Sequence, residues 1–148
     1  MFDLDPSLGG PGLIALFVSA FTSATLLPGS SEVLLGAMVA QGEWSVAALV
    51  GWATLGNTLG SMTTFALGGW AGRRKSEEFA RRGERAALAW LRRHGLWALS
   101  LAWVPIVGDA LCLVGGWLRL PPLRACVLIG CGKLARYGVI ALLASRIA

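Results

Sequence analysis

The chain has 148 residues, of which 55% are hydrophobic and only 14% are charged, and its mean hydropathy is +0.66. This composition excludes an ordinary soluble domain of the same size and predicts one small integral membrane domain. The net charge of +5 does not indicate nucleic-acid binding, because eight of the thirteen Lys and Arg residues lie in 73–93, beside apolar segments, as is typical of a cytoplasmic membrane loop.

The first apolar stretch, residues 13–40, is interrupted by Pro28 and Gly29, which end a helix there. Neither half reaches the roughly 20 residues that a spanning helix requires. Glu32 follows the break and places a carboxylate at membrane depth, where an ionisable group is costly and indicates a functional site. The stretch is either one broken spanning helix or a re-entrant hairpin that returns to its own side of the membrane.

The next segment, residues 45–70, is long, apolar and uncharged, and we expect it to span the bilayer. Gly56 and Gly60 have the GxxxG spacing that lets another backbone approach closely. Asn57 lies between them, and it is a polar residue near the middle of the segment. The sequence therefore predicts a helix that combines a packing motif with one polar site residue.

The strongly polar segment, residues 73–95, holds eight Lys and Arg and three Glu residues. Its apolar residues recur at helical spacing, which leaves the arginines mostly on the other side. This pattern predicts an amphipathic helix on the membrane surface. The alternative is a loop whose charge only sets the topology.

The second broken stretch, residues 96–118, repeats the device of the first. Pro105 breaks it, and Gly108 and Asp109 follow. After a Pro-Pro turn, residues 123–144 form the second spanning candidate. The chain thus alternates between a broken apolar stretch and a long apolar helix.

Four ionisable side chains are expected at membrane depth. Lys133 and Arg136 lie inside the last apolar segment, while Glu32 and Asp109 follow the two breaks. Unpaired charges are costly at this depth, so we expect the two acids to pair with the two bases. The pairs either hold the hairpins in place or form a binding site.

The two halves of the chain align as an internal repeat. Shifts of 76 or 77 residues superpose the proline breaks, the acids and the glycines of the long helices, namely Pro28 on Pro105, Glu32 on Asp109 and Gly56 on Gly132. If each half is a hairpin that does not cross and a helix that crosses once, the second half is inverted relative to the first. Inverted repeats with broken segments that meet at the midplane are typical of transporters.

The distribution of basic residues favours two re-entrant hairpins over two broken spanning helices. With 73–93 in the cytoplasm, re-entrant hairpins leave the N-terminal segment, which lacks Lys and Arg, outside. They also keep Arg119 and Arg124 inside, and only Arg146 disagrees. Non-helical backbone at this depth must be covered by protein or must line a wet cavity.

We therefore predict an all-α polytopic membrane protein that forms a single membrane domain over residues 1–148. Two inverted hairpin–helix repeats occupy about 12–72 and 96–146, and their re-entrant hairpins oppose each other. The basic amphipathic surface helix at 73–95 links the repeats, and the loop at 73–93 is cytoplasmic.

Four stretches that together run along nearly the whole chain carry a family resemblance, namely SATLLPGSSE (23–32), ATLGNTLG (53–60), WVPIVGD (103–109) and GKLARY (132–137). At these residues the chain resembles the DedA superfamily, also called VTT or SNARE-associated membrane proteins, in its small YqaA-like branch. The resemblance implies two opposed re-entrant hairpins and a multi-pass protein of the bacterial inner membrane.

The resemblance also implies work on lipids. Members of the superfamily translocate or scramble lipids, including the undecaprenyl phosphate carrier, and are tied to proton-motive force. Larger members carry an arginine just after the proline of the second hairpin, whereas this chain has Gly108 at the aligned place, followed by Asp109. Lys133 and Arg136 are therefore the candidate cations for the head group.

The leading hypothesis is a lipid translocase or scramblase for anionic phospholipid or polyprenyl phosphate. The sequence leaves open whether the transport is coupled to protons. Lys133 and Arg136 neutralise the phosphate, Glu32 and Asp109 hold these cations and exchange protons, and Asn57 belongs to the same site. The alternative is a proton-coupled carrier of a small polar or cationic solute, in which the acids bind the substrate. A third hypothesis is a scaffold for other membrane proteins.

Enzyme chemistry is not expected. His94 lies outside the apolar segments, and the sequence contains no nucleophile, metalloprotease or phosphate-loop motif. The three cysteines lie in apolar stretches without a ligand pattern, so no metal or cofactor is expected. The expected partners are membrane lipids and protons, without nucleic acid. Two hairpins and two helices are thin for a transport path, so a homodimer through Gly56 and Gly60 is a candidate, and Gly132 is a third helix-packing glycine.

Overall fold

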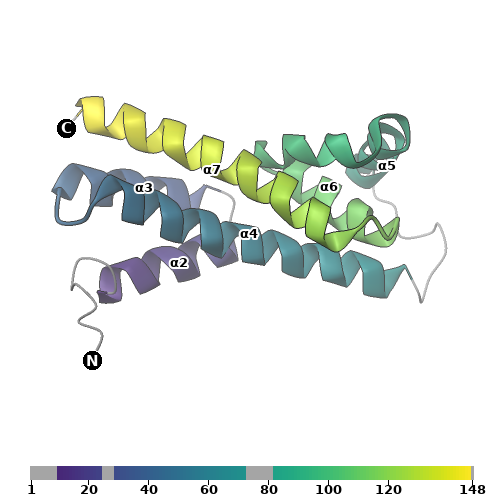
Figure 1. Ribbon diagram of the computed structural model, residues 1–148, viewed down its shortest axis with the longest axis horizontal. Coiled ribbons are helices and arrows are strands. Elements are labelled where there is room, and N and C mark those ends of the chain that lie inside the picture. Colours follow the sequence, from purple (N-terminus) through teal and green to yellow (C-terminus); the bar gives the residue numbers. More distant parts are fainter. Residues whose placement is uncertain (1–9, 25–28, 73–81, 148) are drawn as a thin grey trace.

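The structure is a computed structural model that describes residues 10–24, 29–72 and 82–147. In these ranges every regular element is a helix, which confirms the all-α prediction (Figure 1). In chain order the elements are α2 (Pro11–Ser23), α3 (Ser30–Gln41), α4 (Val46–Ala71), α5 (Arg82–His94), the 3-10 helix η1 (Gly95–Trp103), α6 (Val107–Trp117) and α7 (Pro122–Ile147).

The two long helices, α4 and α7, have 26 residues each and run antiparallel along the long axis of the molecule (Figure 1). Of the described helices, only α7 is both long and apolar enough to cross a membrane. Helix α4 is equally long and uncharged, but small and polar residues dilute its apolar ones. It nevertheless leaves Leu55, Leu59 and Leu67 about half exposed, as a lipid-facing helix does. That α4 crosses the membrane stays a prediction.

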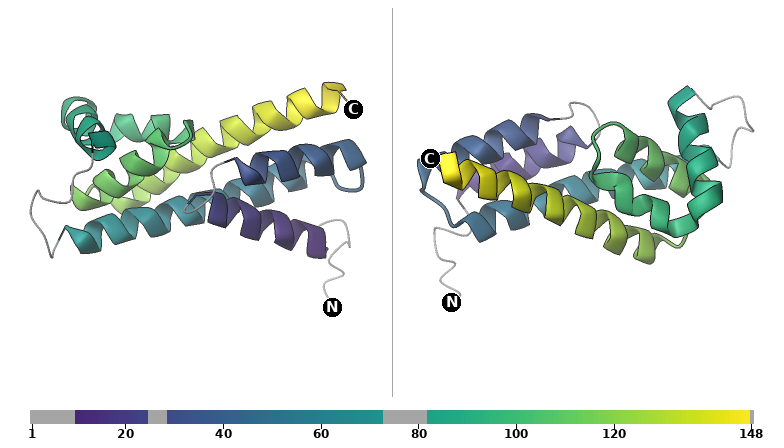
Figure 2. Two further views of the ribbon diagram at one scale, coloured as in Figure 1. Left: turned by 180° about the vertical axis from the view of Figure 1, so that it is seen from behind. Right: turned by 90° about the horizontal axis from the view of Figure 1, so that it is seen from above.

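Two hairpins occupy opposite ends of the α4–α7 pair. The end of α2 and the start of α3 face its middle, as do the end of η1 and the start of α6 (Figure 2). One hairpin is formed by α2 and α3, the other by η1 and α6, and both pairs of arms are in contact. Helix α2 packs on α4 and α3 packs on α7, whereas η1 packs on α7 and α6 packs on α4. Each hairpin therefore places its first arm on the long helix that follows it and its second arm on the other long helix.

Glycines on the long helices seat the first arm of each hairpin. A Cβ atom at Gly60 would lie 2.5 Å from the Phe21 carbonyl oxygen of α2, and Gly56 approaches the same helix. On α7, a Cβ at Gly132 would lie 3.2 Å from the Ser100 carbonyl oxygen of η1. The GxxxG face of α4 is thus covered within the chain, which corrects the expectation that it joins two copies; the homodimer itself stays a prediction.

Helix α5 differs from the expected membrane-surface helix. Its apolar residues Ala87 and Leu91 are buried in a core that it shares with η1 and α6, while Arg92 and Arg93 are exposed. The amphipathic pattern is therefore real, but protein covers the apolar side. The cause is the second hairpin, whose short arms leave apolar surface that α5 buries. Residues 73–81 of the predicted segment lie outside the described ranges.

Candidate functional site

A polar layer separates two apolar cores at mid-length of the long helices. On α4, Ala53 belongs to the core around the first hairpin and Phe65 to the core around the second. On α7, Ala141 belongs to the core around the first hairpin and Ile129 to the core around the second. The residues between them include the buried polar side chains Asn57, Thr58, Ser61 and Lys133. The layer thus lies at mid-length of the long helices, where the start of α3 and the start of α6 face each other (Figure 2).

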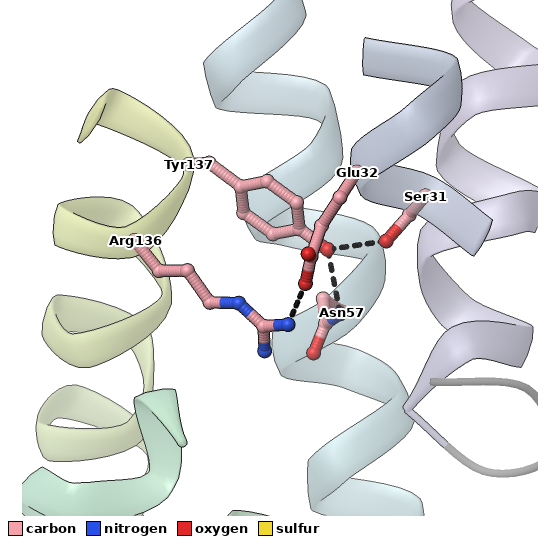
Figure 3. Close-up of polar contacts among 5 residues, drawn as sticks. All are labelled: Ser31, Glu32, Asn57, Arg136 and Tyr137. Carbon is pink, nitrogen blue, oxygen red and sulfur yellow. Dashed lines mark hydrogen bonds and ion pairs between the residues drawn. The ribbon is translucent and has the colours of Figure 1, made fainter. Parts of the chain in front are cut away.

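The first hairpin places Glu32 in this layer, where its carboxylate forms an ion pair with Arg136 of α7 (Figure 3). The Arg136 side chain is 12% exposed and that of Glu32 is 28% exposed. Glu32 also lies in the first turn of α3, where the helix dipole favours a negative charge. The carboxylate is therefore held by its own helix and by the last helix.

The Tyr137 hydroxyl joins three helices beside this ion pair (Figure 3). It lies 2.8 Å from the Ser31 Oγ of α3, and it accepts a hydrogen bond of 2.6 Å from the Asn57 Nδ2 of α4. Tyr137 and Ser31 are fully buried. The sequence interpretation did not single out these two residues, although Tyr137 is the only tyrosine of the chain and directly follows Arg136.

The second hairpin brings Asp109 close to Lys133 without an ion pair. The two side chains are near enough to interact electrostatically, and both also interact in this way with the Cys112 thiol of α6. Lys133 is only 2% exposed, yet its ammonium has no ion-pair partner within 4.0 Å among the described residues. Over the same ranges, no three His, Cys, Asp or Glu side chains come together as metal ligands. Among the described residues, the structure thus pairs one predicted base and leaves the other without an ion pair.

Four polar residues of α4 follow one another at helical spacing on the side that faces the layer. Each has a buried oxygen without a hydrogen-bond partner in the described part of the chain. These oxygens are Thr54 Oγ1, Asn57 Oδ1, Thr58 Oγ1 and Ser61 Oγ. A buried polar group without a partner costs about 1–3 kcal/mol. Only Asn57 was singled out from the sequence. The spacing i, i+3, i+4 and i+7 was the signal that could have found the other three.

The two hairpin turns reach the layer by different backbone routes. Gly29 has a φ of +98° and begins α3, whereas Pro28 lies outside the described residues. In the second hairpin Ile106 has φ +68° and ψ −56°, and the Val107 N–H donates to the Pro105 carbonyl at 2.7 Å. This is a γ-turn of the rare, strained form.

Gly108 follows directly, and it lets α6 start against the preceding arm. A Cβ atom at this position would lie 2.8 Å from the Ala102 carbonyl carbon of η1, closer than side chains tolerate. The close approach is what brings Asp109, the next residue, to the end of α6 that faces the layer. The residues predicted as hairpin breaks in the second half, Pro105 and Gly108, therefore lie in or beside the turn that positions the acid.

Comparison with known proteins shows similarity over most of the chain. It is 43% identical over 129 residues to the inner membrane protein YqaA of Escherichia coli, which covers 87% of this chain and 88% of that protein, and the YqaA of Shigella flexneri gives the same values. An uncharacterized protein of Haemophilus influenzae is 40% identical over 134 residues, with 84% and 82% covered. No family model and no solved structure matches. The chain belongs to the YqaA family of inner membrane proteins.

Proposed function

We propose that this chain is a lipid translocase of the DedA superfamily, which moves anionic phospholipid or polyprenyl phosphate between the leaflets of the inner membrane. The observation that carries the proposal is Lys133, a cation at mid-length of α7 that is 2% exposed and has no ion-pair partner among the described side chains. An intramembrane charge is costly, so it is retained for a function. A phosphate that crosses hydrocarbon requires such a counter-charge.

The packing of the hairpins supports an inverted repeat. The first arms correspond: α2 contacts α4, and η1 contacts α7. The second arms also correspond, because α3 contacts α7 and α6 contacts α4. Exchanging the two long helices therefore exchanges the two sets of contacts. Because α4 and α7 are antiparallel, the exchange reverses the direction of the chain through the membrane (Figure 1). In the proposed topology both long helices cross, the hairpins enter from opposite sides, and the segment 73–93 is cytoplasmic.

The charges suggest how the phosphate is handled. Arg136 is held by Glu32, so Lys133 is the cation that meets the phosphate first. Asp109 balances Lys133 from a distance until the phosphate arrives. A second negative charge beside Lys133 then disfavours the Asp109 carboxylate and favours proton uptake, because like charges repel. In this scheme lipid movement and proton movement are coupled at the second hairpin.

The test measures lipid movement in proteoliposomes that contain labelled phosphatidylglycerol, phosphatidylcholine or a polyprenyl phosphate, with and without a pH gradient. The wild type is compared with Lys133→Met, which removes the charge, and with Leu134→Met, which places the same side chain on the exposed side of the same helix. We expect Lys133→Met to lose transport without losing thermal stability, because it removes a buried charge that lacks an ion pair. Leu134→Met should transport normally.

Two outcomes contradict the proposal: folded wild-type protein that moves no lipid, and Lys133→Met that moves lipid at the wild-type rate. The competing hypothesis of a small-solute carrier has its own signature. A photoactivatable phospholipid should cross-link to the hairpins of a translocase, since a lipid tail needs an opening toward the bilayer. A carrier of a small cationic solute gives no such cross-link and depends on Asp109.

A further inference from the structure

Lys133 shares its surroundings with the hydroxyl-bearing face of α4. Ser61 and Lys133 both neighbour the Cys112 thiol of α6, and Ser61 Oγ does not have hydrogen-bonding geometry to that thiol. Thr58 faces Gly130 of α7, which is one helical turn before Lys133. Two buried hydroxyls from one long helix and a buried lysine from the other therefore lie in the same polar layer.

These three groups have the same chemical property: each can donate a hydrogen bond. Among the described residues, the Thr58 and Ser61 hydroxyls have no hydrogen-bond partner, and Lys133 has no ion pair. Ser61 is 0% exposed and Thr58 is also buried. A cation and two hydroxyl donors complement an oxyanion, and hydrogen bonds to a charged group are stronger than those between neutral groups. Asn57 is not counted among these donors, because its Oδ1 only accepts and its Nδ2 already donates to Tyr137.

Gly130 leaves room for a methyl group beside the buried Thr58 side chain on its α7 side. A Cβ atom at Gly130 would have ordinary contacts of 3.7 Å with Thr58 Cγ2 and 3.8 Å with Thr58 Oγ1, and it meets no other heavy atom within 4 Å. Packing within the protein therefore does not require glycine here. Glycine in a helix interior costs about 1 kcal/mol relative to alanine, so its presence opposite the hydroxyl is consistent with access to that hydroxyl.

We infer that Thr58, Ser61 and Lys133 form an oxyanion seat for a phosphate group, separate from the Glu32–Arg136 ion pair. The inference rests on the proposed function, which it deepens by assigning the head-group contacts to α4 hydroxyls and one lysine. The phosphate belongs either to a lipid head group or to free phosphate, because both present the same oxygens. The ion pair of the first hairpin holds the neighbouring helix and leaves the seat to Lys133.

Binding measured apart from transport tests the seat. Radiolabelled inorganic phosphate is bound to the protein in detergent by equilibrium dialysis, and phosphatidic acid binding is followed by native mass spectrometry. The variants are Ser61→Ala, Thr58→Val and the double substitution. Thr63→Val is the matched control, because the Thr63 hydroxyl is exposed and already donates to the Leu59 carbonyl at 3.0 Å.

We expect each hydroxyl deletion to weaken binding about tenfold and the double substitution to abolish it, while Thr63→Val binds like the wild type. The melting temperature should stay equal or rise, because neither hydroxyl has a partner to lose. Binding of inorganic phosphate identifies a site that free phosphate reaches, and binding of phosphatidic acid alone identifies a lipid head-group site; either supports the seat.

The seat is overturned if neither probe binds, or if the hydroxyl variants bind both probes like the wild type. The two proposals fail separately. Wild-type protein that moves lipid while the double variant binds and moves it equally well contradicts the seat and leaves the translocase standing. Binding that depends on the hydroxyls, in a protein that moves no lipid, supports the seat and contradicts the translocase.

Discussion

The two hairpins pack on the long helices by the same rule but are held in the polar layer by different means. In the first hairpin Glu32 has its ion pair with Arg136, Ser31 contacts Tyr137, and the turn uses Gly29, which adopts positive φ without strain. In the second hairpin Asp109 has no ion pair among the described residues, and the turn uses Ile106, a β-branched residue at positive φ. Equal packing therefore does not give equal fixation: close backbone packing holds both hairpins, and polar bonds between helices hold the first one in addition.

The largest expected effect comes from the backbone contact that holds the second hairpin. A Cβ atom at Gly116 of α6 would collide with the Phe65 carbonyl oxygen of α4, and this atom cannot move aside as the end of a side chain can. We expect Gly116→Ala to lower the free energy of unfolding by about 3 kcal/mol. Denaturation in detergent micelles, followed by circular dichroism, measures the loss.

Gly36→Ala on α3 is the matched control in the first hairpin, because no heavy atom lies within 4 Å of its added Cβ. Alanine is the better helix former, so this variant should be neutral or slightly stabilising. Equal losses in the two variants would falsify the claim that close backbone packing is what holds α6.

The acids should differ next. Glu32→Gln leaves Arg136 without its carboxylate, and we expect a loss of about 2 kcal/mol, below the 3–5 kcal/mol of a fully buried pair because Glu32 is partly exposed. Asp109→Asn breaks no ion pair and should cost less than half as much. Both values come from the same denaturation experiment at neutral pH.

A charge exchange provides the control for the ion pair. The double variant Glu32→Arg with Arg136→Glu keeps one charge of each sign, so it should recover stability relative to either single change. If Asp109→Asn proves as costly as Glu32→Gln, the contrast between a paired and an unpaired acid is wrong.

The hydroxyl of Tyr137 comes third. Tyr137→Phe leaves Ser31 Oγ and Asn57 Nδ2 without their partner, so we expect a loss of about 1–2 kcal/mol. Ser31→Ala should cost less, because the tyrosine hydroxyl keeps its bond from Asn57. Thermal unfolding of the two variants checks the order, and a larger loss in Ser31→Ala would contradict the bridging role of Tyr137.

The smallest effect concerns the turns. Ile106→Gly should stabilise the protein by about 0.5–1 kcal/mol, since the strain of a non-glycine residue at positive φ exceeds the entropic cost of glycine. Gly29→Ala should act in the opposite direction by about 1 kcal/mol. Melting temperatures of both variants test this, and a destabilised Ile106→Gly would show that the γ-turn is not strained.

The helices and the breaks between them could be predicted because their signals are local. Pro105, the glycines and the acids are visible in the sequence, and charge cost at membrane depth leads one to expect acid–base pairs. Which acid meets which base could not be predicted, because it depends on how α7 is rotated about its axis. In its described part, the structure joins Glu32 to Arg136 and leaves Lys133 near Asp109 without an ion pair.

Two other features escaped the sequence for physical reasons. An amphipathic pattern shows that α5 has an apolar side but not whether lipid or protein covers it, and here the core residues Ala87 and Leu91 meet η1 and α6. A 3-10 helix has no composition of its own, so residues 95–103 read as an ordinary apolar run. Both the covering of α5 and the winding of η1 depend on packing against other helices, which local sequence does not show.

The 3-10 winding of η1 sets the length of the first arm of the second hairpin. Nine residues of 3-10 helix rise about 18 Å, whereas the same residues would rise about 13.5 Å as an α-helix. The 13 residues of α2 rise about 20 Å as an α-helix, so the two first arms are nearly equal in length although one has fewer residues. Both exceed half of a hydrocarbon layer about 30 Å thick, and neither crosses it. Pitch, and not residue number, thus matches the lengths of the two first arms. In the proposed topology, this equal length places the two acids at similar depths.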